Sequence, residues 1–208
     1  MVMTIQVPYK LTLKLALAAA ALMALTGSAS ADWRNQITDY DAGRLTSLEQ
    51  ARADAVHQAE TRGGSGDFRA IKETFEADAH GVPEQALYGT WRCRQMKLGG
   101  MTGYAVFNWF PCRISRVGGG VWFEKQGTQR MAGYLYPEKG GLWIYLGAQS
   151  ARGEPWHRYS GRYASVGPST TPDDQVGALV GIGNNALRID LPTPATQESD
   201  FDAIELVR

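Results

Sequence analysis

The stretch LWIYL at residues 142–146 decides the fold, because its side chains alternate between two kinds. In an extended chain the three aliphatic side chains point to one side and the two aromatic side chains point to the other. Residues 187–191 and 204–206 alternate in the same way between aliphatic and charged side chains. Strands with two different faces favour antiparallel pairing, so this pattern predicts an antiparallel sheet.

Short runs of this kind, rich in glycine and aromatic residues, fill the chain from residue 87 to residue 208. Turn signals separate them about every ten residues, which is the spacing of an all-β sheet or barrel. No helical pattern lies between them, so we expect a mainly β domain at 87–208, an antiparallel up-and-down barrel or a strongly twisted sheet. The expected strands are Thr90–Leu98, Tyr104–Ser115, Val121–Lys125, Arg130–Tyr136, Leu142–Leu146, Trp156–Tyr163, Gln175–Ile182, Ala186–Leu191 and Asp202–Val207.

A different pattern precedes the strands and predicts a helical hairpin within residues 32–86. Its first helix can start from a capping box at Thr46 or at Ser47. Apolar residues follow at three- and four-residue steps, the spacing of one helical face. They are Leu45, Leu48, Ala51, Ala55 and Ala59.

The second helix of this hairpin follows the glycine-rich break at residues 63–66, and Asp67 is placed to cap it. Phe68, Ile71 and Phe75 form its apolar stripe, and HGVP at 80–83 ends it. Such a short hairpin cannot bury enough surface alone. We therefore expect the stripe to dock on the sheet and to cover part of its aromatic residues.

Residues 1–31 have the layout of a secretory signal peptide. Lys10 and Lys14 provide a positive start, residues 15–25 are apolar, and small residues end the segment. We predict cleavage between Ala31 and Asp32 and a periplasmic or secreted mature protein. The apolar run is shorter than the ~20 residues that span a bilayer. No later run is long and apolar enough, so we expect no transmembrane segment after cleavage.

Export makes a disulfide between Cys93 and Cys112 the favoured interpretation of the two cysteines, because extracytoplasmic compartments are oxidising. If the two residues lie directly opposite each other in the first hairpin, a two-residue loop falls at Thr102-Gly103. A competing loop from Gly99 to Gly103 needs a bulge to bring the sulfurs together. The alternative is a pair of buried free thiols.

Composition and motifs argue against several function classes. The chain has 21 Lys+Arg and 21 Asp+Glu, whereas a nucleic-acid-binding surface needs a basic excess. His57, His80 and His157 fit no zinc-binding pattern, and no catalytic serine motif occurs, so we predict no metal and no catalytic residue. GIGNNA at 181–186 has the form of a dinucleotide fingerprint, but no helix has room to follow it. We expect a hairpin turn there and no cofactor.

Aromatic residues provide the candidate binding site. One face of four consecutive strands carries six of them, and if these strands are neighbours the rings form one band. The opposite, aliphatic face, with Val121, Leu135 and Ile144, is the expected core. Such a band can stack a sugar, a peptide or a lipid headgroup; the alternative is that the helical hairpin covers it. The candidate ligand-binding residues are Trp109, Trp122, Tyr134, Tyr136, Trp143 and Tyr145.

Arginine is also abundant in the β part. Arg92 and Arg94 share one strand face, and Arg113 lies on the neighbouring strand. Such a cluster can bind a carboxylate or phosphate through parallel hydrogen bonds. The alternative, which we favour, is a solvated outer surface with acids such as Glu124 nearby.

Several blocks of the chain resemble a family of exported bacterial proteins known as a domain of unknown function, DUF4893. They include WRCR at 91–94, CRI at 112–114, GYLYP at 133–137, LRIDLP at 187–192 and IELV at 204–207. The resemblance covers most of residues 33–208. It implies a location in the bacterial envelope, no assigned activity and no catalytic residue.

A second, weaker resemblance is to lipocalin-like and bacterial protease-inhibitor barrels, through Gly89-Thr90-Trp91. A tryptophan at this place can plug the end of a barrel, and the glycine permits close backbone approach. Fold does not imply function, so the likeness supports a barrel rather than an activity.

Together these features favour a non-catalytic exported protein that binds a small ligand, an envelope component or another protein. Two alternatives stay open, a periplasmic protease inhibitor and a hydrolase that uses His157 as its base. A deep aromatic cavity favours ligand binding, whereas a filled core with a protruding N-terminal segment favours an inhibitor. A polar cleft with a serine or a carboxylate beside His157 favours a hydrolase.

Overall fold

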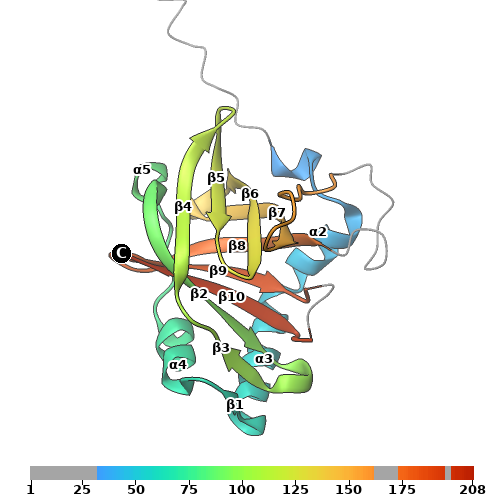
Figure 1. The fold of residues 1–208 in the computed structure, drawn as a ribbon, viewed down its shortest axis with the longest axis vertical. Helices are drawn as coiled ribbons and strands as arrows, with labels where there is room; N and C mark the ends of the chain where they lie inside the picture. The colour runs from blue at the N-terminus through green and yellow to red at the C-terminus, as the bar shows by residue number, and fades with distance from the viewer. Residues whose placement is uncertain (1–31, 162–172, 195–197) are drawn as a thin grey trace, which may run out of the picture. The chain divides into compact units, whose positions relative to one another are not determined.

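The computed structural model describes residues 32–161, 173–194 and 198–208 (Figure 1). The predicted signal peptide, residues 1–31, lies outside the described residues, so its cleavage between Ala31 and Asp32 stays a prediction. Among the described residues, no helix has the length and apolar character needed to cross a membrane.

Eight antiparallel strands close into a barrel, which confirms the predicted fold class (Figure 1). Neighbours follow the order β2-β10-β9-β8-β7-β6-β5-β4, and pairing between β2 and β4 completes the circle. Closure leaves few unpaired strand edges. The strands are β2 (Gly89–Leu98), β4 (Phe110–Val117), β5 (Gly120–Lys125), β6 (Gln129–Pro137), β7 (Trp143–Ala151), β8 (Asp174–Gly183), β9 (Ala186–Pro192) and β10 (Phe201–Val207).

Two short strands extend the edge of β2, where β3 (Tyr104–Val106) pairs with its second half and β1 (Gly64–Ser65) pairs with β3. The described helices are α2 (Asp39–Thr46), α3 (Leu48–Arg62), α4 (Phe68–Glu76) and α5 (Glu84–Leu87), with short 3₁₀ turns η2 (Trp33–Asn35), η3 (Gly100–Thr102) and η4 (Lys139–Gly141).

The predicted helix caps are half right. The Asp67 side chain accepts a hydrogen bond from the backbone N–H of Arg69 and caps α4 as expected. Of the two predicted starts, Ser47 is the N-cap residue of α3, whereas Thr46 is the last residue of α2, a preceding helix capped by Thr38 that was not predicted. Ser47 lies at the break between α2 and α3 and makes no side-chain cap bond.

The apolar stripe of α4 docks on the sheet as predicted, but on other strands than expected. Ile71 and Phe75 pack against β2 and β10, where the rings of Phe75 and Phe201 are 6.0 Å apart. α3 covers the same region through Ala55 and Ala59. These helices therefore do not cover Trp122 on β5 or Trp143 on β7, and this part of the prediction is wrong.

The face of β7 that fills the barrel is the aromatic one, which corrects the predicted core. Tyr145 pairs in register with Leu135, and Leu135 pairs with Val121, so all three side chains point inward. Ile144 and Leu146 point outward and pack against the N-terminal segment around Ile37. Both faces of β7 are buried, so alternation distinguishes the faces but cannot tell which one is inside.

A disulfide joins Cys93 and Cys112, as predicted, with their Cα atoms 5.8 Å apart. Direct opposition of the two residues is wrong: Cys93 pairs with Phe110 and Cys112 with Trp91. The competing loop is the one formed, closed by a 2.7 Å hydrogen bond from the Gly99 N–H to the Gly103 carbonyl. Residues 107–109, which leave the ladder between β3 and β4, provide the irregularity that this loop requires.

The run predicted as a strand at 156–163 forms no strand over its described part, Trp156–Gly161. Side chains rather than a neighbouring strand bind its backbone here. The His157 N–H donates to Ser150 Oγ at 2.8 Å, and the Ser160 N–H donates to Asp174 Oδ1 at 3.0 Å. Such local bonds compete with a sheet ladder.

Candidate functional site

The barrel interior is a packed core rather than a ligand cavity. Trp91 and Trp143 plug one end, donating from their indole N–H groups to the Leu87 and Val82 carbonyls at 2.9 Å. Phe123 and Tyr145 fill the middle in edge-to-face contact. An eight-stranded barrel has just enough room for such side chains. The role suggested for the tryptophan of Gly89-Thr90-Trp91 is confirmed.

The other end of the interior is polar. Asp202 is buried there and accepts hydrogen bonds from Gln95 Nε2 at 2.7 Å and from Ser199 Oγ at 2.5 Å. Lys125 donates to the Gln129 carbonyl at 2.7 Å, and burial lowers its pKa from 10.5 to about 8. A cavity lined by Gln95 and Asp202 measures about 10 Å³, which suits a single water molecule.

The six candidate aromatic residues do not form one band. Trp143 and Tyr145 point into the barrel. Trp109 lies in the β3–β4 connection beneath Arg92 and Arg94. The predicted single surface is therefore wrong, because register pairs Tyr134 with Leu146 rather than with an aromatic residue of β7. The other three rings, those of Trp122, Tyr134 and Tyr136, do stay together.

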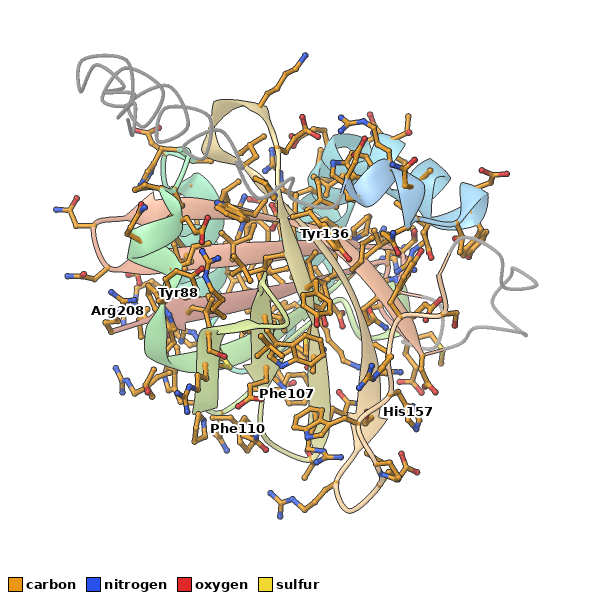
Figure 2. The ribbon with its side chains drawn as sticks, turned by 90° about the horizontal axis from the view of Figure 1, so that it is seen from above. Tyr88, Phe107, Phe110, Tyr136, His157 and Arg208 are labelled. Atoms are coloured by element: carbon orange, nitrogen blue, oxygen red, sulfur yellow. A yellow bond between two sulfur atoms is a disulfide. The ribbon has the colours of Figure 1, made fainter. Side chains whose placement is uncertain are left out.

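These three rings line a pocket of about 280 Å³ on the outside of β5, β6 and β7, which we call the aromatic pocket. Ring centroids are 4.9 Å apart for Trp122 and Tyr134 and 6.3 Å apart for Tyr134 and Tyr136. Figure 2 marks Tyr136 near the middle of the molecule in that view. The lining consists of Gln36, Val117, Trp122, Gly133, Tyr134, Tyr136, Leu146, Arg158, Tyr159 and Gly161.

The opposite wall of the aromatic pocket is fixed by a buried polar network. The Tyr159 hydroxyl donates to Asp41 Oδ2 at 2.7 Å and accepts from the Thr38 N–H at 3.0 Å. Asp41 in turn forms a buried 2.8 Å ion pair with Arg44. Burial raises the pKa of Tyr159, so its hydroxyl stays protonated at neutral pH. The N-terminal segment and the 158–161 segment are thereby held together at the pocket.

Several polar groups of the aromatic pocket have no protein partner within the described ranges. They are the indole N–H of Trp122, the hydroxyls of Tyr134 and Tyr136, the Gln36 amide and the Arg158 guanidinium. Burial raises the pKa of Tyr136, which keeps this hydroxyl neutral and able to donate. Apolar ring faces with a few free polar groups are the usual composition of a small-molecule site.

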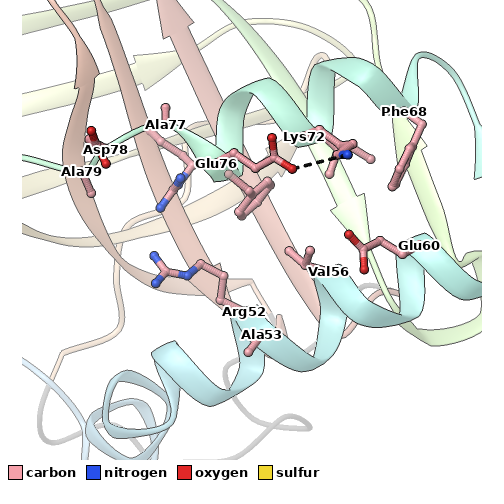
Figure 3. Close-up of a pocket in the computed structure, with 13 residues that line it drawn as sticks. Arg52, Ala53, Val56, Glu60, Phe68, Lys72, Glu76, Ala77, Asp78 and Ala79 are labelled. Atoms are coloured by element: carbon pink, nitrogen blue, oxygen red, sulfur yellow. Dashed lines mark ion pairs between the residues drawn. The ribbon is translucent and has the colours of Figure 1, made fainter.

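A larger groove of about 410 Å³ lies between α3 and α4, with Val56, Phe68 and Phe75 along it (Figure 3). Its basic side chains are already paired inside the protein. Arg188 makes two hydrogen bonds to Asp190, at 2.7 and 2.9 Å, and Lys72 pairs with Glu76 at 3.5 Å. The apolar lining belongs to the helix–sheet packing. Among the described residues, the unpaired charged groups of the groove are the carboxylates of Glu60 and Asp78.

His157 has the carboxylate that the hydrolase alternative requires but not the nucleophile. Its Nδ1 atom lies 3.0 Å from Asp173 Oδ2 (Figure 2 labels His157). The hydroxyl of Ser160 donates instead to Asp174 at 3.1 Å. In the part of the chain that the structure describes, no hydroxyl forms a hydrogen bond with the His157 ring. Covalent catalysis requires a nucleophile within hydrogen-bond distance of the base.

Two residues of the arginine cluster face acidic side chains on neighbouring strands. Arg94 forms an ion pair with Glu205, and Arg113 lies opposite Glu124 in register. Residues 181–186 form a hairpin between β8 and β9, as predicted, with no helix after them. Over the described ranges, no three or more His, Cys, Asp or Glu side chains gather into a group suited to a metal ion.

The polar pocket residues that the sequence did not indicate are Gln36, Arg158 and Tyr159. They come from irregular segments that have no periodic pattern, and Tyr159 lies in a run that was expected to be a strand. A tyrosine beside an arginine is too common to identify a site.

The model of the DUF4893 family, a domain of unknown function, matches residues 33–206. No curated protein and no solved structure matches the chain.

Proposed function

We propose that this chain, which belongs to the DUF4893 family, is a non-catalytic binding protein whose aromatic pocket holds the ring of a small sugar. The observation that carries the proposal is the set of unpartnered polar groups around the faces of Trp122, Tyr134 and Tyr136. Ring faces pack against the C–H face of a sugar, while hydroxyl, amide and indole groups bond its hydroxyls.

The shape of the aromatic pocket favours a sugar over a flat aromatic ligand. The rings of Trp122 and Tyr134 meet at 74° and those of Tyr134 and Tyr136 at 58°. They therefore form a faceted surface rather than a parallel slot. A volume of about 280 Å³ is at the small end for ligand pockets, which limits the occupant to about one ring.

The test is titration of residues 32–208 with glucose, galactose and N-acetylglucosamine, followed by tryptophan fluorescence or NMR. A single sugar ring in such a site binds with a Kd of about 1 mM. Trp122→Ala should weaken binding about tenfold, because one stacked ring face is lost. Trp156→Ala, which removes an indole that stacks on Arg130 outside the pocket, is the control. Equal effects of the two substitutions would contradict the proposal.

A subtler pair of variants tests the hydrogen bonds without changing the ring faces. Tyr136→Phe removes a hydroxyl that faces the pocket, whereas Tyr40→Phe removes one from an exposed tyrosine on α2. We expect a weakening of three- to tenfold in the first variant and none in the second.

We propose that the mature protein is located in the periplasm or outside the cell. The disulfide between Cys93 and Cys112 supports it, since such bonds persist in oxidising compartments. N-terminal sequencing of exported protein should give Asp32 as the first residue. Recovery of Met1 on the exported protein would contradict the cleavage.

A protease inhibitor is a second candidate, favoured by the filled interior of the barrel. The described N-terminal residues, however, dock on the strands through α2, α3 and α4 instead of protruding as such an inhibitor requires. Incubation with a panel of serine and cysteine proteases at micromolar protein tests this function, and unchanged protease activity would remove it.

A further inference from the structure

We infer that the sugar in the aromatic pocket carries a carboxylate, and that Arg158 binds it. This inference rests on the proposed function and names the ligand class of the same site. The class is a single hexuronic acid ring, either free or at the end of an acidic glycan.

The charge of the lining is the first argument. Among the described residues that line the aromatic pocket, Arg158 is the charged one and no acidic side chain is present. Asp41, the acid bonded to the lining residue Tyr159, is also bonded to Arg44 and Thr38. The site therefore presents an uncompensated positive charge, which favours an anionic over a cationic ligand.

The acidic residues near Arg158 contact its neighbours in the chain rather than Arg158 itself. His157 contacts Asp173, and Ser160 donates to Asp174 Oδ1, whereas the buried Oδ2 atom of Asp174 has no partner among the described residues. Arg158 itself has no ion-pair partner within the described ranges. Its guanidinium remains free to make two parallel hydrogen bonds to a carboxylate.

The chain around Arg158 is held in place without any ligand. The His157 N–H is bonded to Ser150, the Tyr159 hydroxyl to Asp41, and the Ser160 N–H to Asp174. Anchors on both sides hold the residue at the rim of the aromatic pocket. A binding group on a fixed segment loses less conformational entropy when its ligand arrives.

The experiment compares glucuronate with glucose and galacturonate with galactose, on residues 32–208 at low salt. We expect each acid to bind about tenfold more tightly than its neutral parent. A galacturonate dimer, as a third arm, distinguishes a free acid from a glycan end: tighter binding of the dimer supports the glycan end, and weaker binding supports the free acid.

Arg158→Gln should make the acid and its neutral parent bind equally, and Arg158→Lys should keep part of the preference. Arg152→Gln, an exposed arginine of the β7–β8 connection, is the matched control. Equal affinities for acid and neutral sugar in the unmodified protein, or a preference that survives Arg158→Gln, overturn this inference and leave the proposed function standing. Failure of all the sugars to bind overturns both.

Discussion

Arg208 links α5 to the end of the barrel that Trp91 fills, and its replacement by alanine should lower the free energy of unfolding. Its Nη2 atom donates to the Tyr88 carbonyl at 2.6 Å and to the Ala86 carbonyl at 3.1 Å, where α5 ends (Figure 2 shows Arg208 near Tyr88). Its guanidinium carbon lies 3.9 Å from the centre of the Trp91 ring. The carbonyls at the end of a helix have no hydrogen-bond donor within the helix, so the guanidinium of Arg208 supplies donors that they otherwise lack.

The magnitude follows from these contacts. Two hydrogen bonds from a cation at a partly exposed site contribute about 1 kcal/mol each. The contact with the Trp91 ring adds about 0.5–1 kcal/mol. Arg208→Ala should therefore cost about 2–3 kcal/mol, and Arg208→Lys about half of that, since the ammonium keeps the charge but loses the planar fork.

Urea denaturation of residues 32–208, monitored by tryptophan fluorescence, measures the decrease in the free energy of unfolding. We expect a lower midpoint at an unchanged m-value. Arg92→Ala is the matched control, because its described contact is a ring 5.2 Å away, and it should change stability by less than about 0.5 kcal/mol. If Arg208→Ala changed the free energy of unfolding as little as the control does, the proposed fastening would be wrong.

Four further predictions concern the core. Replacing Cys93 and Cys112 by alanine should cost about 3 kcal/mol, and the unfolded, unreduced parent should show no reactive thiol; two thiols per chain would refute the bridge. Phe75→Asp, at the edge of the α4 stripe, should cost about 3 kcal/mol in urea unfolding, and an unchanged midpoint would refute the docking. Tyr145→Phe should be neutral or stabilising, because the buried hydroxyl of Tyr145 has no partner among the described residues; a loss above about 1 kcal/mol would reveal one. Lys125 binds its proton less tightly in the folded protein than in the unfolded chain, so the free energy of unfolding should rise with pH between about 8 and 10.5. Lys125→Met should abolish this pH dependence, which urea denaturation at several pH values measures.

The sequence predicts the barrel well, because alternation and turn spacing are local properties of the chain. The register of the first hairpin is less accessible, since its loop depends on positive φ at Gly99, Gly100 and Gly103 rather than on the shortest connection. Which face of residues 142–146 points into the barrel could not be predicted from the sequence either. Both faces of β7 are buried, one by the barrel and the other by the N-terminal segment around Ile37.

Local periodicity predicts the strand side of the aromatic pocket but not its opposite wall. Trp122, Tyr134 and Tyr136 lie on paired strands, so their periodicity places them on one face. The wall opposite depends on contacts between residues far apart in the chain. Tyr159 reaches Thr38 and Asp41 across more than a hundred positions, and no local pattern encodes such a meeting.

The filling of the barrel explains why a binding site lies on its outer surface. Eight strands enclose a space that Trp91, Phe123, Trp143 and Tyr145 fill among the described residues. A strand face outside the barrel becomes a pocket only where other segments build walls around it. The N-terminal segment and the 158–161 segment do this over β5, β6 and β7, where the network around Asp41 ties one to the other. A ligand in the aromatic pocket therefore touches both segments, and its binding should stabilise the N-terminal helices along with the barrel.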